Sequence, residues 1–361
     1  MKIVLYSPYF PHHFGGGEKY FLDAALVWAQ AGHQVSIALG SQVVNVDKIK
    51  KSYQQFLGCS LAAINFCPSP LRSGSFAAKL HWSRQFDVLY YLTDGSAFLS
   101  LAKRNLMHIQ TPLLLSPKTG WDKFKFNHFN IINTNSLFTK QVVEKSWGIK
   151  VDLVCYPGVS LQPVTKAVAK KPLILHVGRF FRQQHAKRQD VLLTCWRQLL
   201  ALYPQFASKW QLLFIGSVED EQYYQQCRQQ AAGLPVSFLT NASRSQLELA
   251  YRQAAIYWHA TGFGIDPATH PEKMEHFGIT TVEAMMAGAV PVVIAAAGQK
   301  EILGQYLSQY SWQTPAECVA ITAKLMQQRS LRLKLGQQAL KRSGKFAATV
   351  FARQHLAMLK D

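Results

Sequence analysis

The chain has little that would anchor it in a membrane. Its longest uncharged run of apolar and small residues, 284–298, has 15 residues and contains Pro291, whereas a helix that spans a bilayer needs roughly 20 apolar residues. The first residues read directly as a short apolar strand, without the apolar stretch and small-residue cleavage site of a signal peptide. We therefore expect no transmembrane segment and a cytoplasmic location.

Motifs for metals and redox cofactors are also missing. The six cysteines form no Cys-x-x-Cys pair, which argues against structural zinc and against a disulfide framework. No Gly-x-Gly-x-x-Gly segment indicates a dinucleotide cofactor, and there is no Asp-x-Asp segment. His12 and His13 are adjacent, but the spacing offers no third ligand. We expect no metal and no required cofactor.

Acidic residues are scarce. The 361 residues include 20 Asp and Glu against 39 Lys and Arg, for a formal net charge of +19. The anionic partners that suit such a balance are nucleic acid, a membrane surface and a phosphorylated substrate. The excess is spread along both halves of the chain rather than gathered in one arm. This distribution favours phosphorylated or lipid-linked ligands, and we expect no nucleic-acid partner.

Apolar runs alternate with amphipathic segments in both halves, which predicts an α/β protein with parallel sheets. In the first half we expect a helix at 18–31 and strands at 3–7, 35–39, 88–92, 131–134 and 152–155. In the second half we expect strands at 173–177, 212–215, 236–239, 256–259 and 290–294, with helices at 187–202, 220–231, 244–254 and 278–286.

The length suits two domains of ordinary size. Residues 160–172 mix Pro, Lys, Thr and Ala without a helical or strand period, as expected of a linker. We place the first domain at 1–160, the linker at 161–172 and the second domain at 173–340, each domain a Rossmann-like doubly wound unit. Residues 341–361 are expected to form a helix that packs back on the first domain.

Ligands of open parallel sheets bind at the carboxyl ends of strands, so the loops after the strands are the candidate sites. After the first strand, Gly15, Gly16 and Gly17 offer close backbone approach and free amides to a phosphate or sugar; an unliganded turn is the alternative. After 173–177, Arg179 leaves the strand end and Lys187 is expected to open a helix, so that both cations converge on a diphosphate. A solvated basic loop is the alternative.

The most specific segment runs from Glu275 to Val293. Gly278 stands at a predicted helix start, where unpaired amides favour an anionic ligand. Glu275 precedes this helix and Glu283 lies about one and a half turns inside it, so we expect the two carboxylates to face different parts of one ligand. The neighbours of Glu283 are mostly apolar, and a buried carboxylate needs a partner. This favours a ligand hydroxyl over an ordinary exposed charge.

Together these segments resemble the retaining glycosyltransferases of family 4, over most of the chain. The segments that carry the resemblance are Glu275 to Glu283 with Phe277-Gly278 and Glu283-Ala284-Met285, the Gly178-Arg179 and Lys187 loop, the glycine-rich first loop, and Tyr156-Pro157-Gly158-Val159. The forms Gly178-Arg179-Phe180-Phe181 and His259-Ala260-Thr261-Gly262 look closest to a branch that includes lipid-linked oligosaccharide mannosyltransferases. The segment Gly298-Gln299 departs from the family's Gly-Gly.

The resemblance implies the GT-B fold, in which two Rossmann-like domains face a central cleft. It also implies transfer of a hexose, with mannose and glucose as candidates, from a nucleotide-diphosphate sugar to a saccharide, lipid-linked or small-molecule acceptor. The anomeric configuration would be retained. No metal would be needed, because Arg179 and Lys187 would neutralise the departing diphosphate.

The resemblance further implies a role for each candidate residue. Glu275 would hold hydroxyls of the donor sugar and Glu283 the ribose. The amides of Phe277, Gly278 and Ile279 would hold the sugar–phosphate region, and Gly15, Gly16 and Gly17 would close on the phosphates. His108 matches a histidine that lines the reaction centre in the family; a purely structural histidine is the alternative.

Residues 118–129 interleave lysines with aromatic residues, a composition suited to an anionic lipid headgroup. We therefore expect peripheral contact at the inner face of a membrane; rings that pack inward are the alternative. Three rival activities stay open for the chain. They are a glycosidase built on Glu275 and Glu283, a nucleotide-sugar epimerase with the GT-B fold, and a non-catalytic protein that binds an anionic ligand.

Overall fold

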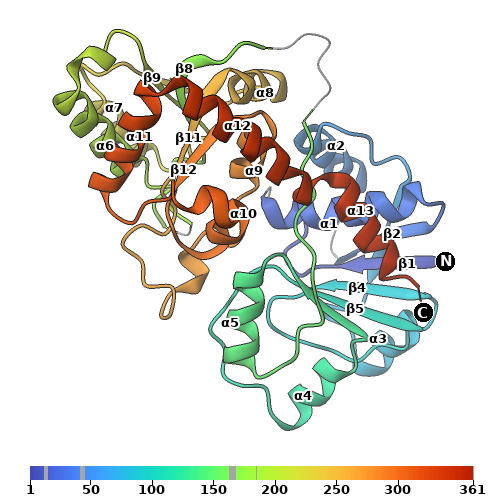
Figure 1. Ribbon diagram of the computed structural model, residues 1–361. Helices are drawn as coiled ribbons and strands as arrows, with labels where there is room; N and C mark the ends of the chain where they lie inside the picture. The colour runs from blue at the N-terminus through green and yellow to red at the C-terminus, as the bar shows by residue number, and fades with distance from the viewer. Residues whose placement is uncertain (12–14, 41–44, 162–167, 184, 361) are drawn as a thin grey trace. The chain divides into compact units, whose positions relative to one another are not determined.

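The computed structural model describes residues 1–11, 15–40, 45–161, 168–183 and 185–360 (Figure 1). The chain divides into two compact units: unit 1 comprises Met1–Gly158 and Ala348–Asp361, and unit 2 comprises Val159–Ala347. The expected boundary after 160 therefore lies after Gly158, and the returning segment begins at Ala348 rather than at 341. No helix in the described part of the chain is long and apolar enough to cross a membrane.

Unit 1 is built on a parallel sheet with the strand order β3-β2-β1-β4-β5-β6-β7. Its strands are β1 (Lys2–Tyr6), β2 (Gln34–Gly40), β3 (Ile64–Ser69), β4 (Val88–Leu92), β5 (Arg104–Ile109), β6 (Ile131–Thr134) and β7 (Leu153–Val154). Its helices are α1 (Gly16–Gln30), α2 (Val46–Leu57), α3 (Phe76–Ser83), α4 (Gly120–Asn127), α5 (Leu137–Trp147) and α13 (Ala348–Ala357).

The sheet of unit 1 is buried on both faces, as parallel sheets require. Along β4, Tyr90 and Leu92 join one apolar cluster while Leu89 and Tyr91 join the other, because successive side chains of a strand point to opposite faces. The final helix α13 lies beside α1 (Figure 1). Trp28 of α1 donates its indole N–H to the carbonyl of His355 at 3.0 Å. The C-terminal helix thus completes the core of unit 1.

Unit 2 has a parallel sheet with the order β10-β9-β8-β11-β12. Its strands are β8 (Lys171–Val177), β9 (Gln211–Ile215), β10 (Val236–Leu239), β11 (Ala254–His259) and β12 (Val290–Val293). Its helices are α6 (Gln189–Leu202), α7 (Glu221–Gln230), α8 (Arg244–Gln253), α9 (Ile279–Met286), α10 (Ala297–Ser308), α11 (Pro315–Gln327) and α12 (Arg329–Ser343), with short 3-10 turns at Pro204–Phe206, Pro271–Lys273 and Gly344–Phe346.

The strand order of unit 2 reverses between β8 and β11. From β8 the chain moves outward to β9 and β10, and it then returns to the other side of β8 with β11 and β12. The loops that follow β8 and β11 therefore leave neighbouring strands in opposite directions and open a crevice between them. Such a switch point is where ligands of doubly wound sheets bind.

Three sequence-based expectations need correction. Helix α6 begins at Gln189 rather than at Lys187, because Arg188 has left-handed backbone angles (φ 54°) that no α-helix contains. Strand β8 begins at Lys171, inside the expected linker, of which 162–167 lie outside the described residues. Residues 341–343 belong to α12 of unit 2 and not to the returning helix.

Candidate active site

The loop after β8 holds Lys187 in a fixed position at the strand end. A Cβ on Gly178 would meet Lys187 Cγ at 2.6 Å, so the lysine chain crosses the loop where only glycine leaves room. Two nearby residues of the loop, His185 and Arg188, both have positive φ, 53° and 54°. Side chains disfavour this conformation by about 1–2 kcal/mol each, and such strain is typical of functional loops. The Gln189 amide ties the loop by donating to the carbonyls of Gly178 and Arg179.

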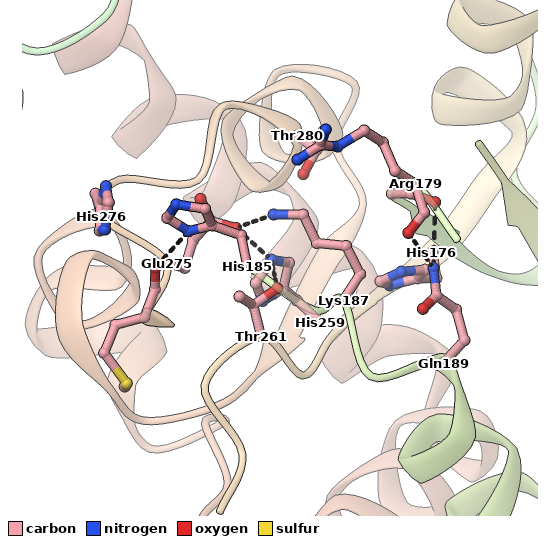
Figure 2. A network of polar contacts seen from close by, with 12 residues as sticks. His176, Arg179, His185, Lys187, Gln189, His259, Thr261, Glu275, His276 and Thr280 are labelled. Atoms are coloured by element: carbon pink, nitrogen blue, oxygen red, sulfur yellow. Dashed lines mark hydrogen bonds and ion pairs between the residues drawn. The ribbon is translucent and has the colours of Figure 1, made fainter. Parts of the chain in front are cut away.

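Lys187, Glu275 and His259 form a buried polar cluster at the switch point (Figure 2). Lys187 Nζ lies 2.6 Å from Glu275 Oε2, and their side chains are only 18% and 17% exposed. His259, the last residue of β11, places Nε2 3.0 Å from the same oxygen. Burial alone would raise the pKa of Glu275, but Lys187 and His259 hold the pKa well below its usual value. Glu275 is therefore ionised at neutral pH.

Two histidines of this region carry buried acceptor atoms that lack partners. Burial lowers the pKa of His259, although Glu275 opposes the shift, so the ring is neutral at neutral pH. Because Glu275 can only accept, His259 Nε2 carries the proton, and the lone pair of Nδ1 has no partner. His176 donates from Nδ1 to the Trp258 carbonyl at 3.0 Å, which leaves Nε2 unpaired. A ligand hydroxyl would satisfy these atoms, since buried polar groups are normally hydrogen-bonded.

A second pair of histidines supports the segment before α9. His185 and His276 pack edge to face with ring centroids 4.6 Å apart. His185 Nδ1 lies 3.2 Å from the Met274 carbonyl, and His276 Nε2 lies 3.3 Å from that of Glu272. Burial lowers the pKa of His276 to about 3. Neutral rings thus fix the backbone on both sides of Glu275. Sequence reasoning assigned no role to these four histidines. His176 and His259 could have been found, because they stand at the ends of neighbouring strands, where the ligands of such sheets bind.

Helix α9 begins at Ile279, directly after Gly278, which has a φ of 112° and offers no side chain to cap the helix. The first amides of a helix lack intrahelical partners and favour an anion. The side chain of Gln299 packs here: a Cβ on Gly278 would meet its Nε2 at 2.5 Å. Gln299 is fully buried, yet both its amide oxygen and nitrogen are unpaired, as is Thr281 Oγ1 in the first turn. The start of α9 therefore combines free amides with unsatisfied side-chain groups.

Gly298-Gln299, which stands where the resembling family has Gly-Gly, keeps a close backbone contact through Gly298. Gly298 donates its N–H to the Glu275 carbonyl at 3.0 Å. A Cβ on Gly298 would meet the His276 carbonyl oxygen at 2.3 Å, so only glycine fits. Gly298 thus holds Glu275 from α10, while Gln299 adds a side chain beneath Gly278. Of the residues predicted at the start of α9, Phe277 is buried and Ile279 is half-buried.

Two predicted residues, Arg179 and Glu283, pair with residues outside the Lys187–Glu275–His259 cluster. Arg179 lies in the same loop after β8 as Lys187 (Figure 2). It pairs with Glu219 at 2.9 Å, and its side chain is 44% exposed. Exposed pairs of this kind contribute little, about 0–1 kcal/mol. Glu283 is buried and bonds Arg244 at 2.7 Å and the Tyr251 hydroxyl at 2.8 Å. The buried carboxylate thus has protein partners, which sequence reasoning did not find.

In unit 1, His108 lies at the interior of the protein. It is fully buried in β5, with Nδ1 2.6 Å from Asn133 Oδ1 and Nε2 2.8 Å from Gln110 Oε1. Tyr20 of α1 stacks on the ring at 3.9 Å. Burial lowers the pKa of His108 to about 4, so the ring is neutral at neutral pH.

The glycine-rich start of α1 lies next to this histidine. Gly16 and Gly17 open the helix, and the Gly15 N–H donates to Glu18 at 3.1 Å. A Cβ on Gly17 would lie 3.5 Å from Gln110, which contacts His108. His12 and His13 lie outside the described residues. Among the residues that the structure does describe, no group of three or more His, Cys, Asp and Glu could hold a metal ion.

Comparison with known families decides the class of the protein. The model of the family "Glycosyl transferases group 1" matches residues 161–342, half of the chain. The chain belongs to this family. It is a glycosyltransferase, and the matched region contains the Lys187–Glu275–His259 cluster and the start of α9. The rival class of non-catalytic anion-binding proteins is thereby set aside.

A curated relative of this group 1 glycosyltransferase is a GDP-Man:Man(3)GlcNAc(2)-PP-Dol alpha-1,2-mannosyltransferase of Yarrowia lipolytica. The two are 24% identical over 263 residues, which cover 66% of the chain and 34% of the relative. The chain thus spans about a third of the length of that protein.

Solved structures share the fold over the full chain. Anabaena HepE, in complex with UDP and glucose, superposes with a TM-score of 0.67 at 17% identity, covering 99% of this chain and 98% of the other. TarM gives 0.74 at 9% identity, covering 100% and 99%. WaaG, a glycosyltransferase involved in lipopolysaccharide biosynthesis, gives 0.65 at 13% identity, covering 100% of both chains. The α/β fold with two Rossmann-like domains is that of GT-B glycosyltransferases.

Proposed function

We propose that this glycosyltransferase belongs to family 4 and transfers a hexose, mannose or glucose, from a nucleotide-diphosphate sugar to a saccharide, lipid-linked or small-molecule acceptor, with retention of configuration. The observation that carries the proposal is the Lys187–Glu275–His259 cluster beside the start of α9. It offers a cation, an ionised carboxylate and unpaired buried acceptors at one switch point. Such a set suits a ligand with both phosphate and hydroxyl groups.

The proposed donor contacts follow from these groups. Lys187, with Arg179 released from its exposed pair with Glu219, would neutralise the diphosphate. The amides of Phe277, Gly278 and Ile279, before and at the start of α9, would bind the sugar–phosphate region. Glu275 and the Nδ1 lone pair of His259 would accept hydrogen bonds from sugar hydroxyls.

Two further contacts are proposed at the nucleotide. Glu283 would accept from the ribose, because each of its oxygens can accept a second hydrogen bond beside those from Arg244 and Tyr251. Gly15, Gly16 and Gly17 of unit 1 would approach the phosphates with their backbone. The bound UDP of HepE and the GDP-mannose in the name of the Yarrowia relative support a nucleotide-sugar donor and leave the base open.

The proposed reaction breaks the bond between the anomeric carbon and the diphosphate oxygen. The acceptor hydroxyl forms the new bond on the same face, and its proton passes to the departing phosphate. The chain contributes positioning and charge stabilisation. Because Lys187 and Arg179 supply positive charge at the leaving group, we propose that no metal takes part. His108 is neutral with both nitrogens occupied, so we propose that it acts at the reaction centre by orienting Gln110 beside Gly17.

A panel of donors tests this function. The protein is incubated with UDP-, GDP- and ADP-sugars, with thermal unfolding and product analysis by mass spectrometry as readouts. We expect one donor series to raise the melting temperature and to yield a glycoside when a saccharide acceptor is present. Conversion of the donor sugar to its epimer without an acceptor would support an epimerase, and free sugar released from a glycoside would support a glycosidase. A protein that no donor stabilises would overturn the proposal.

We further propose that unit 1 contacts the inner face of a membrane through α4. Trp121 and Phe124 are 61% and 54% exposed and stack on each other at 5.1 Å, while Phe126 of the same helix is buried. The aromatic rings of 118–129 therefore show both arrangements considered from the sequence: two rings are exposed to solvent and one packs inward. Lys123 is exposed beside the aromatic pair. Exposed aromatic rings flanked by lysine suit the interface of an anionic bilayer.

Liposome sedimentation tests the membrane contact. Trp121→Ser with Phe124→Ser should release the protein from vesicles that contain anionic lipid, because each ring supplies buried apolar area at the interface. Lys123→Glu should weaken binding at low salt, since each basic residue near the surface contributes about 1 kcal/mol. Phe76→Ser, at a ring 58% exposed elsewhere in unit 1, is the matched control. Binding that is unchanged in the Trp121 and Phe124 variant would reject the contact.

A further inference from the structure

Unit 2 contains a cavity whose lining shares no residue with the proposed donor contacts. Its volume is about 390 Å³, within the range of small-ligand sites. The loops after β8 and β11 form it together with α7, and its charged and aromatic lining residues are Arg182, Arg188, Asp190, Tyr223, Phe263 and Lys273. Lys187, Glu275 and His259 are absent from the lining. The lining therefore shares no residue with the Lys187–Glu275–His259 cluster, although it comes from the same two loops and includes Ala186 and Arg188, on either side of Lys187.

The lining carries three cations against one carboxylate. Arg188 donates from Nε and Nη2 to Asp190, both at 3.1 Å, and from Nη1 to the Phe263 carbonyl at 2.7 Å. Arg182 donates to Asp220, Gln222 and Gln226 at 3.1–3.3 Å. A guanidinium has five N–H groups, so three are used in each arginine and two remain. The remaining groups can donate to a ligand without breaking the present contacts.

Aromatic rings hold both guanidinium groups in place. Arg188 lies 5.6 Å over the ring centre of Phe263, and Arg182 lies 5.5 Å over that of Tyr223. Stacking of this kind fixes the guanidinium plane and leaves its edge for an oxyanion. The Tyr223 hydroxyl also donates to Asp190 at 3.0 Å, which places the carboxylate on Arg188. The two arginines are thus oriented before any ligand arrives.

Lys273 supplies the third cation without a counter-charge. It ends the 3-10 turn Pro271–Lys273 and is half-buried. No carboxylate pairs with it among the residues that the structure describes. Because Lys273 lines the cavity without a carboxylate partner, an anion in the cavity would have a cation available for a charge-assisted hydrogen bond.

The loop that carries Phe263 and Lys273 is preformed. Gly262 has φ 93°, and a Cβ there would meet Met274 at 2.7 Å. Backbone hydrogen bonds at 3.0–3.2 Å run from Ile265 to Gly262, from His270 to Asp266 and from Met274 to Pro271. Arg188 itself has the left-handed conformation that turns it away from the path of α6. A site that is rigid before binding loses less entropy when the ligand binds.

We propose that this cavity is an oxyanion site that binds a phosphorylated sugar distinct from the nucleotide-sugar donor. Its phosphate would accept from the free N–H groups of Arg182 and Arg188 and from Lys273, and its sugar would occupy the remaining volume beside Phe263. The proposal goes beyond the proposed function, because none of these residues takes part in the donor chemistry. The phosphorylated sugar is either the acceptor or a regulator of the enzyme, and the two share this binding chemistry.

Titration calorimetry with glucose 6-phosphate as the probe and glucose as the neutral control tests the site. We expect the full chain to bind the phosphate ester and to bind glucose far more weakly. Lys273→Glu should weaken binding of glucose 6-phosphate at least ten-fold, because it replaces a charge-assisted contact by repulsion. Lys209→Glu makes the same change of net charge at an exposed position of unit 2 and should bind as the natural chain does.

The donor-site variant Lys187→Gln separates this proposal from the proposed function. It should retain binding of glucose 6-phosphate even if transfer is lost. With the nucleotide sugar present, a new phosphorylated disaccharide in the mass spectrum identifies the probe as an acceptor, and a changed rate of donor turnover with the probe recovered intact identifies it as a regulator. No binding by the natural chain, equal binding by Lys273→Glu, or loss of binding in Lys187→Gln would overturn the proposal.

Discussion

His108 in unit 1 and His259 in unit 2 are both fully buried and neutral, but their surroundings differ. Both nitrogens of His108 contact amide side chains of its own unit. His259 contacts Glu275, which Lys187 neutralises, and its other nitrogen is unpaired. Unpaired groups also remain on His176, Thr281 and Gln299 of unit 2. Unit 1 also has unpaired buried atoms, for example on Asn105 and His355, so the difference is one of position. In unit 2 such atoms lie at the ends of β8 and β11 and at the start of α9, where a ligand of the switch point would meet them.

Removal of the Lys187 charge should have the largest effect. Lys187→Gln keeps a hydrogen-bond donor for Glu275 and removes the cation beside the proposed leaving group. We expect kcat/KM for sugar transfer to fall about 100-fold or more, as for loss of one transition-state contact in other enzymes. Steady-state kinetics with the natural chain and with Lys209→Gln as control measures the effect. Near-normal turnover with intact folding would remove Lys187 from the mechanism.

Acid should destabilise both units through their buried histidines. Burial lowers the pKa of His108 to about 4 and that of His176 to about 3, whereas an unfolded histidine has a pKa near 6.5. The unfolded state therefore binds more protons below pH 6.5, and the free energy of unfolding falls as the pH is lowered. For His108 alone we expect a loss of about 2 kcal/mol at pH 5 and about 3 kcal/mol at pH 4.

Chemical denaturation between pH 7.5 and pH 4 measures this dependence. His108→Gln should flatten the profile, because it removes the proton that the unfolded state gains at this position and the folded state does not. His81→Gln, at an exposed position of α3, should leave the profile unchanged. Equal slopes for all three chains would show that His108 is not held neutral by burial.

Replacement of Gln299 should have a smaller effect, which raises the stability of the protein and lowers its affinity for the donor. Gln299→Leu removes two unpaired buried polar atoms while keeping a similar volume, so we expect the free energy of unfolding to rise by about 1 kcal/mol. If its amide serves the ligand, donor affinity should fall about ten-fold, as for one lost hydrogen bond to a charged group. Thermal unfolding and donor titration measure the two changes. A variant that is both less stable and normal in donor affinity would assign Gln299 to structure alone.

The sequence predicted unit 2 better than unit 1. Strands of unbroken apolar residues were found within a few positions, and β10 at Val236–Leu239 has the expected bounds. Two strands of unit 1 were missed. Strand β3 contains Pro68, and β5 contains Arg104, Asn105 and His108, so neither shows an apolar run. Pairing with neighbours, and not local pattern, makes these segments strands.

The sequence allowed single residues of the candidate site to be chosen, but it did not indicate their hydrogen-bond and ion-pair partners. Glu275, Lys187 and Gly278 could be chosen because strand ends and helix starts are visible in the sequence. The partners Arg244 and Tyr251 of Glu283, and Glu219 of Arg179, are distant along the chain, and no local signal indicates them. The left-handed turn at Arg188, which displaces Lys187 from α6, is likewise invisible in residue types.

A crystal structure with a bound nucleotide sugar tests the central claim most directly. The account predicts the diphosphate within hydrogen-bonding distance of Lys187 Nζ and of the first amides of α9, with sugar hydroxyls on Glu275 and on His259 Nδ1. A diphosphate bound elsewhere on unit 2, with Lys187 still joined to Glu275 and His259 Nδ1 still unpaired, would contradict it.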